Sequence, residues 1–118
     1  MRTMLPMKYF SLLLLSALFF LMPLKTDAAE EKIVIASRET HEKCLDLAEG
    51  EKLPYRFSSS ATVNFNIHYH EGKDVRYLEQ QRSILSFEGT ITAPHAGEYC
   101  LMWKNRTWDD AALHYETR

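Results

Sequence analysis

The fold is decided by residues 63–71, which read Val-Asn-Phe-Asn-Ile-His-Tyr-His-Glu. Apolar and polar side chains alternate along this stretch without interruption. The apolar set is Val63, Phe65, Ile67 and Tyr69, and the polar set is Asn64, Asn66, His68 and His70. Successive side chains of a β-strand leave opposite faces of a sheet, so a period of two is typical of a strand with one buried face. The stretch therefore predicts an antiparallel strand with an apolar inner face and a polar outer face.

Short apolar or alternating runs recur on both sides of this stretch. The predicted strands cover residues 33–36, 44–47, 53–57, 63–70, 84–92, 99–103 and 111–117. We expect residues 58–60 to form a loop and the charged stretch 38–43 to be a connection. The polar stretch 75–83 has no clean period, and it is interpreted as a long connection, with one irregular strand within it as the alternative. Gly89, inside a strand, indicates a bulge or a close approach of the backbone. About seven short strands predict an all-β fold, an antiparallel β-sandwich.

The N-terminal residues have the features of a targeting segment. A positive start and an apolar run over residues 12–24 precede Thr26-Asp27-Ala28, which supplies the small residues of a cleavage site. This pattern predicts a signal peptide over residues 1–28 and a single domain over 29–118. The alternative is an uncleaved signal anchor, although the apolar run of about a dozen residues is shorter than the roughly 20 that span a bilayer.

The charge balance restricts the class of partner. The chain has 14 basic and 16 acidic residues, for a formal net charge of −2. A mildly acidic domain without a basic cluster argues against binding to nucleic acid or to anionic lipid surfaces. Contact with a membrane is therefore expected only through an uncleaved leader.

The chain has two cysteines, Cys44 and Cys100, and both follow the leader. An even number in an exported chain predicts one disulfide. It would close a loop of about 57 residues and stabilise the fold by about 4 kcal/mol. Two buried free thiols are the other interpretation.

The polar face of the alternating stretch is the first candidate site. His68 and His70 share this face about 7 Å apart, which is close enough to bind one metal ion. Zinc sites use three or four ligands, and copper also favours imidazole. Two ligands are fewer than such a site needs, so a solvated strand face is the other interpretation. Weak binding of Cu(II) or Zn(II) by His68 and His70 therefore stays as an alternative function.

Catalysis has little support in the sequence. There is no Gly-x-Ser-x-Gly nucleophile elbow and no glycine-rich phosphate loop. Cys100 lies in a predicted core strand, where a disulfide suits it better than nucleophilic chemistry. Asn105-Arg106-Thr107 matches the N-glycosylation pattern, which applies where the organism glycosylates exported proteins. We expect a non-enzymatic protein without a cofactor.

Trp108 lies in a predicted turn and is a candidate contact residue. Exposed tryptophan is favoured at protein interfaces, although packing over the end of the sandwich is an equal alternative. The predicted binding surface is made of Asn64, Asn66, His68, His70 and Trp108.

Several motifs together resemble the GOLD (Golgi dynamics) domain, a β-sandwich of cargo receptors and of lipid-binding and adaptor proteins. They are Cys44, Gly50, the strand over 53–57, the strand and turn over 63–72, Pro94 to Tyr99, and Trp103-Lys104-Asn105. The most specific part is the Gly97-x-Tyr99 and Trp103-x-Asn105 spacing. In the cargo-receptor branch the second cysteine of a cross-sandwich pair would fall near Met102, and here it is Cys100. A shift of two keeps the same strand face, so a bridge from Cys44 stays possible.

The resemblance implies a role without implying a ligand. The family's coiled coil, membrane span and coat-binding tail have no counterpart up to Arg118. What it implies is the sandwich alone, used as a protein- or lipid-binding module. We therefore predict an exported binding module with a protein or lipid partner, located outside the cell, in the periplasm or in the lumen of the secretory pathway.

Overall fold

The computed structural model describes residues 29–117, and these form an all-β fold. The strands are β1 (Ala29–Ile35), β2 (Thr40–Leu47), β3 (Lys52–Glu71), β4 (Asp74–Thr92), β5 (Gly97–Asn105) and β6 (Ala111–Thr117). All pairings between them are antiparallel. The predicted fold class is thereby confirmed, and the prediction of a signal peptide over 1–28 lies outside the described residues. Within 29–117 no helix is long and apolar enough to cross a membrane.

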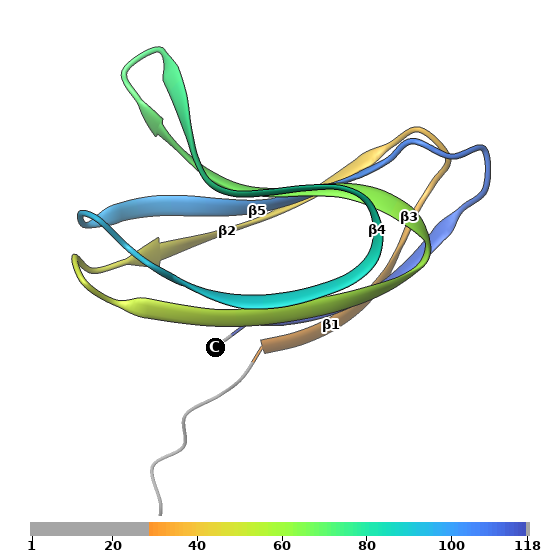
Figure 1. The fold of residues 1–118 in the computed structure, drawn as a ribbon, viewed down its shortest axis with the longest axis horizontal. Coiled ribbons are helices and arrows are strands. Elements are labelled where there is room, and N and C mark those ends of the chain that lie inside the picture. Colours follow the sequence, from red (N-terminus) through yellow and green to blue (C-terminus); the bar gives the residue numbers. More distant parts are fainter. Residues whose placement is uncertain (1–28, 118) are drawn as a thin grey trace, which may run out of the picture.

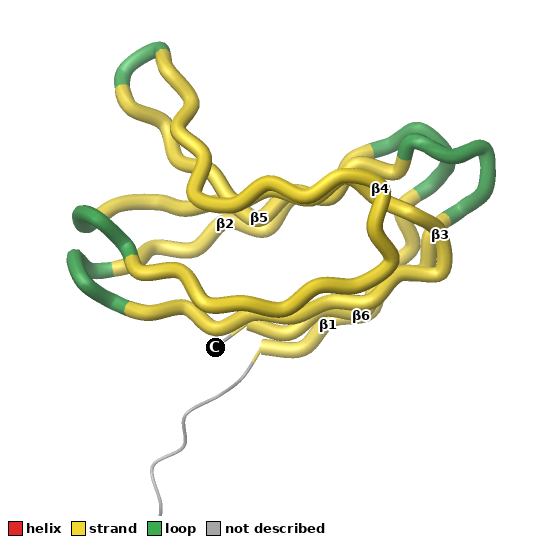
Figure 2. Tube along the Cα trace, in the orientation of Figure 1, coloured by secondary structure: helices red, strands yellow, loops and turns green. Residues whose placement is uncertain are grey.

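The strands form one curled sheet whose two halves face each other (Figure 1). The sheet has six strands in the order β1-β6-β3-β5-β2, and β4 pairs with β3. The first part of β3 pairs with β6, and its second part pairs with β5. Figure 2 shows β3 and β4 passing together from one layer to the other around the closed side of the sandwich.

The predicted loop over 58–60 is wrong, because these residues lie in β3. Of the two interpretations of residues 75–83, the irregular strand is the one that the structure confirms, because they lie in β4. The register of β3 against β4 shifts between Ser58 and Val63, where the paired strands bend from one layer into the next. Residues 75–83 pair with the second part of β3, yet most of their side chains are exposed. Backbone pairing makes them a strand, and without a buried face they show no period of two. The strand count is therefore six rather than about seven.

The predicted connection over 38–43 is also partly wrong, because β2 begins at Thr40. Its residues pair with β5 in an unbroken register from Thr40 and Lys104 to Leu47 and Gly97. The inward-facing positions of this part of β2 are His41 and Lys43, so the sequence has no apolar residues there to indicate a strand.

The core lies between the layers and is rich in aromatic rings. Phe65 is 1% exposed and Trp103 is 0% exposed. The Trp103 ring lies 4.5 Å from that of Tyr115 and 5.5 Å from that of Phe65, measured between centroids. Such pairs contribute about 0.5–1.5 kcal/mol each beyond the burial of their area. The rings of β3, β5 and β6 thus hold the two layers against each other.

Gly89 has the close backbone approach that the sequence predicts. A Cβ atom at this position would lie 2.7 Å from the Tyr55 hydroxyl oxygen. Tyr55 is opposite Gly89 in the β3–β4 ladder, so the missing side chain makes room for the tyrosine ring. Burial raises the pKa of Tyr55 to about 12, and the phenol is therefore neutral at any physiological pH.

Four polar side chains meet at the open side of the sandwich, between β1, β6 and β2. The Tyr115 hydroxyl donates to Glu31 Oε1 at 2.8 Å, and Lys43 Nζ lies 3.1 Å from Glu31 Oε2. His41 Nε2 lies 3.2 Å from the Tyr115 hydroxyl. The hydrogen bond from Tyr115 lowers the pKa of Glu31, whereas burial lowers the pKa of His41. This polar cluster ties β1 and β6 to β2 where no backbone pairing joins the layers.

Asn105 organises the turn between β5 and β6. Its side chain is fully buried, and Nδ2 donates to the carbonyl oxygens of Ile35, Ala36 and Asp109. Its Oδ1 accepts from the Thr107 amide at 2.9 Å. A glycan would replace a hydrogen of Nδ2, so these hydrogen bonds are incompatible with glycosylation of Asn105, although Asn105-Arg106-Thr107 matches the pattern.

The predicted disulfide is confirmed, because Cys44 and Cys100 are bonded. They lie directly opposite each other on β2 and β5. The bond therefore fastens edge strand β2 to the rest of its layer.

We expect the Cys44→Ala/Cys100→Ala variant to lose about 4 kcal/mol of unfolding free energy, because the unfolded chain regains the entropy of the open loop. Urea denaturation followed by tryptophan fluorescence measures this loss. An unchanged midpoint in the double variant would contradict the stabilising role of the bond.

We expect Asn105→Asp to destabilise the protein by about 3 kcal/mol or more, because a buried carboxylate would replace a donor that faces three carbonyl oxygens. Asn64→Asp is the matched control, since Asn64 uses its Oδ1 as an acceptor for the Ser83 amide. That variant should stay within about 1 kcal/mol of the wild type in the same denaturation assay. Equal losses in both variants would refute the donor role of Asn105.

Stability should fall as the pH drops through about 6.5, in part because of His41. Burial lowers the pKa of His41 in the folded state, so the unfolded chain binds the proton more readily and acid favours unfolding. In His41→Gln the difference in unfolding free energy between pH 7.5 and pH 5.5 should be smaller than in the wild type. The exposed His70→Gln is the control, and an identical reduction there would argue against His41 as the source.

Candidate functional site

The predicted polar face exists on the outside of the layer that contains β2, β5 and the second part of β3. Val63, Phe65 and Ile67 are buried inside, so the alternation is confirmed. The four polar residues of β3 differ in exposure, however. Asn64 and Asn66 are half-buried, His70 is exposed, and His68 is only 4% exposed.

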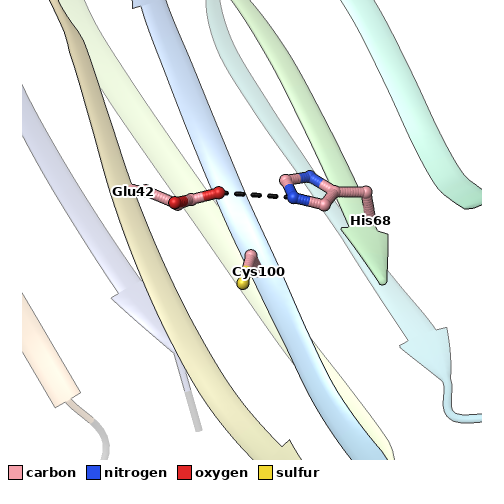
Figure 3. Close-up of side chains that lie close together, drawn as sticks. All are labelled: Glu42, His68 and Cys100. Atoms are coloured by element: carbon pink, nitrogen blue, oxygen red, sulfur yellow. Dashed lines mark ion pairs between the residues drawn. The ribbon is translucent and has the colours of Figure 1, made fainter. Parts of the chain in front are cut away.

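His68 has a polar group at each ring nitrogen. Its Nδ1 lies 2.7 Å from Asn66 Oδ1, and its Nε2 lies 3.3 Å from Glu42 Oε2 (Figure 3). Because an amide oxygen only accepts hydrogen bonds, Nδ1 carries the hydrogen and Nε2 faces the carboxylate. Burial is the main cause that lowers the pKa of His68, while Glu42 acts in the opposite direction.

Glu42 is a residue of this site that the sequence analysis missed. It lies on β2, and β5 runs between β2 and β3 in the sheet. Glu42 is opposite Met102, and His68 is opposite Cys100. The carboxylate therefore reaches across β5, above Cys100, to meet the imidazole (Figure 3). Glu42 and Cys44 have the same parity on β2, so the Cys44–Cys100 pairing was the one signal that could have placed Glu42 near this face.

Asn64 has a structural part in the bend of β4. Its Oδ1 accepts a hydrogen bond from the Ser83 amide at 2.9 Å. Ser83 has a φ of 50°, which is uncommon for a residue other than glycine. Asn64 therefore supports this backbone conformation at the register shift.

Trp108 lies in the loop between β5 and β6 and is 81% exposed. The Arg38 guanidinium lies 4.9 Å from the centre of its ring. Arg38 also donates to the Arg106 carbonyl oxygen, so the β1–β2 and β5–β6 loops are joined. Lys104 Nζ of β5 donates to the Arg38 carbonyl oxygen at 2.8 Å. Of the two interpretations of Trp108, exposure in a turn is the one that the structure confirms.

The structure separates the predicted binding residues into two groups. His68 and His70 lie towards the projecting hairpin of β3 and β4, and Trp108 belongs to the loops at the other end of the molecule (Figure 1). The hairpin also exposes Val75 and Tyr77, which sequence reasoning had placed in a connection. A single surface that includes all five predicted residues is therefore not formed.

Two adjoining hollows lie over the outside of the other layer. Their volumes are about 410 and 430 Å³, and both are lined by Arg56, Glu88 and Glu116. Arg56 and Glu116 form an ion pair at 3.2 Å.

Within residues 29–117, three groups of side chains have the composition of a metal site, and one of them, Cys44, Glu98 and Cys100, contains both cysteines of the disulfide. Two groups remain. One consists of Glu42, His68 and Cys100, of which Cys100 is held in the disulfide. The other consists of Glu30, His114 and Glu116, where His114 Nε2 lies 2.6 Å from Glu30 Oε2. Glu30 is exposed and His114 is half-buried, whereas the His68 side chain is only 5% exposed.

Comparisons with known proteins identify the fold and no family. No family model and no curated protein matches this chain. Among solved structures, the chain is similar to PliG of Aeromonas hydrophila, a periplasmic inhibitor of g-type lysozyme, with a TM-score of 0.60, 15% identity, and coverage of 80% of this chain and 91% of the other.

Two further solved structures share the fold at 12% identity and a TM-score of 0.56 each. One is the mitogen of Yersinia pseudotuberculosis, matched over 79% of this chain and 86% of that one. The other is the pre-peptidase C-terminal domain of a Bacillus anthracis collagenase, matched over 78% and 88%. None of these neighbours is a GOLD domain, so the GOLD resemblance stays a prediction. The chain thus shares a β-sandwich fold with bacterial proteins of different kinds.

Proposed function

We propose that this chain is an exported, non-catalytic module that binds a protein partner through Trp108 and Arg38. The observation that carries the proposal is the 81% exposure of the Trp108 ring. A large apolar ring in water is unfavourable unless a partner covers it. Tryptophan and arginine are also the residue types most enriched among those that dominate binding energy at interfaces.

The loop that presents Trp108 is held in place before any partner arrives. Asn105 Nδ2 donates to the Asp109 carbonyl oxygen at 2.8 Å, and its Oδ1 accepts from the Thr107 hydroxyl at 2.7 Å. Arg38 donates to the carbonyl oxygen of Arg106. Binding would therefore lose little conformational entropy in this loop, which favours affinity.

A protein partner fits this chain better than a lipid. A lipid module of this architecture needs an apolar space between the layers, and here aromatic rings of Phe57, Phe65 and Trp103 pack at centroid distances of 4.8–5.8 Å. The GOLD resemblance implies a protein- or lipid-binding sandwich. One structural neighbour is described as an inhibitor of a lysozyme, which supports a protein partner for a module of this shape.

The disulfide supports a location outside the cytoplasm. Structural disulfides persist in oxidising compartments and are rare in the cytosol. Together with the predicted leader, the Cys44–Cys100 bond favours secretion, the periplasm or the secretory lumen.

The proposal is tested by photo-crosslinking in the organism that produces the protein. A benzoylphenylalanine placed at position 108 should give one dominant crosslinked protein, which mass spectrometry identifies. The same group at Leu85, which is 52% exposed on β4, is the matched control and should not yield this product. With the purified partner, Trp108→Ala should weaken binding about 30-fold, equivalent to about 2 kcal/mol.

Equal crosslinking at positions 108 and 85, or unchanged affinity of Trp108→Ala, would refute the role of this loop. A g-type lysozyme is the first purified protein to assay, because one neighbour inhibits such an enzyme. Inhibition by the wild type that Trp108→Ala and Arg38→Ala both lose would identify the partner class directly.

A further inference from the structure

We propose that His68 and Glu42, with His70 as a third ligand, form a binding site for Zn(II) or Cu(II). The site lies on the outer face at the hairpin end and is independent of the Trp108 loop. It connects a residue pair that no local sequence pattern joins, since Glu42 belongs to β2 and His68 to β3.

The first argument is the state of the His68 ring. Its Nδ1–H donates to Asn66 Oδ1 at 2.7 Å, so in the neutral ring Nε2 has a free lone pair. This nitrogen lies 3.3 Å from Glu42 Oε2, which is also an acceptor. Two acceptors at this distance repel unless a proton or a metal cation lies between them. The His68 side chain is only 5% exposed, so bulk water has little access to compensate.

The second argument is the ligand geometry. Zinc binds histidine nitrogen and carboxylate oxygen at about 2.0–2.2 Å, and at a tetrahedral angle this places two donor atoms about 3.3–3.5 Å apart. The observed 3.3 Å between Nε2 and Oε2 fits such a pair. A metal-bound histidine also commonly donates its other N–H to an oxygen that fixes the ring. In this site the oxygen that accepts from Nδ1–H is Asn66 Oδ1.

The third argument concerns the remaining ligands. His70 is on the same face of β3, its ring centroid lies 5.4 Å from that of His68, and its side chain is exposed. Within residues 29–117 no hydrogen bond of the His70 side chain is found, so its ring is free to rotate towards the ion. Imidazole nitrogen favours zinc and copper over calcium and magnesium, which prefer oxygen ligands. Water would complete the coordination.

The disulfide has a positioning role in this site. Cys100 cannot coordinate a metal while it is bonded to Cys44. The bond joins β2 to β5, and its Cys100 side chain lies beside the Glu42–His68 pair (Figure 3). It therefore fixes the distance across which the carboxylate meets the imidazole.

Isothermal titration calorimetry with ZnCl₂ and with CuSO₄ tests the proposal, on exported protein purified without a histidine tag and stripped with EDTA. We expect a one-site isotherm for at least one ion. His68→Ala and Glu42→Gln should each weaken binding at least 10-fold, and Asn66→Ala should weaken it about 10- to 100-fold through loss of ring orientation. Glu42 is 44% exposed, so Glu42→Gln leaves the packing intact even if His68→Ala unfolds the protein.

His114→Ala is the matched control, because it removes a second histidine that faces a carboxylate on the outer surface. It should bind with wild-type affinity. Nitrogen NMR of the His68 ring should show a shift of Nε2 on addition of zinc, while Nδ1 keeps its hydrogen. The absence of binding of both ions, or binding that His114→Ala abolishes and Glu42→Gln leaves unchanged, would overturn the proposal. Neither result bears on Trp108, so the proposed function is tested separately.

Discussion

The structure depends on the continuity of β3 through the bend between its two parts. One strand pairs with β6 in one layer and with β5 in the other, so the two layers are parts of a single sheet. β4 pairs with β3 on both sides of the bend, so the two strands bend together. Because side chains alternate along the strand, the same continuity sends Leu53, Tyr55 and Phe57 inward from one layer and Val63, Phe65 and Ile67 inward from the other. The aromatic core follows from this constraint.

Contacts between neighbouring strands determine which side chains meet on the outer face of the layer that contains β2, β5 and the second part of β3. The Cys44–Cys100 bond sets β2 against β5, and the β3–β5 register sets His68 opposite Cys100. Glu42 then falls within reach of His68 from two strands away. Backbone pairing thus brings together two polar residues from different strands, and the burial of His68 follows from the neighbouring strands rather than from its own composition.

The two ends of the molecule present different chemistry. At the loop end, Asn105 and the joined loops present a rigid tryptophan beneath an arginine. At the hairpin end, β3 and β4 extend beyond the body (Figure 1) and expose His70 and Tyr77. In many β-sandwich proteins the binding residues lie on loops at the ends of the molecule. The paired strands hold these loops in place while the loop sequences vary. The two proposals for this chain use separate ends and do not depend on each other.

Local periodicity in the sequence determined the all-β class, the inward direction of Phe65 and Trp103, and the outward direction of His68 and His70. These properties follow from the alternation of side chains along one strand, which needs no knowledge of any neighbour. The joining of residues 53–71 into one strand, the strand nature of 75–83, and the meeting of Glu42 with His68 were decided by the tertiary structure alone. Those features depend on which backbones pair and in which register. Register is a relation between distant segments, and where a strand has no buried face the sequence carries no pattern that reports it.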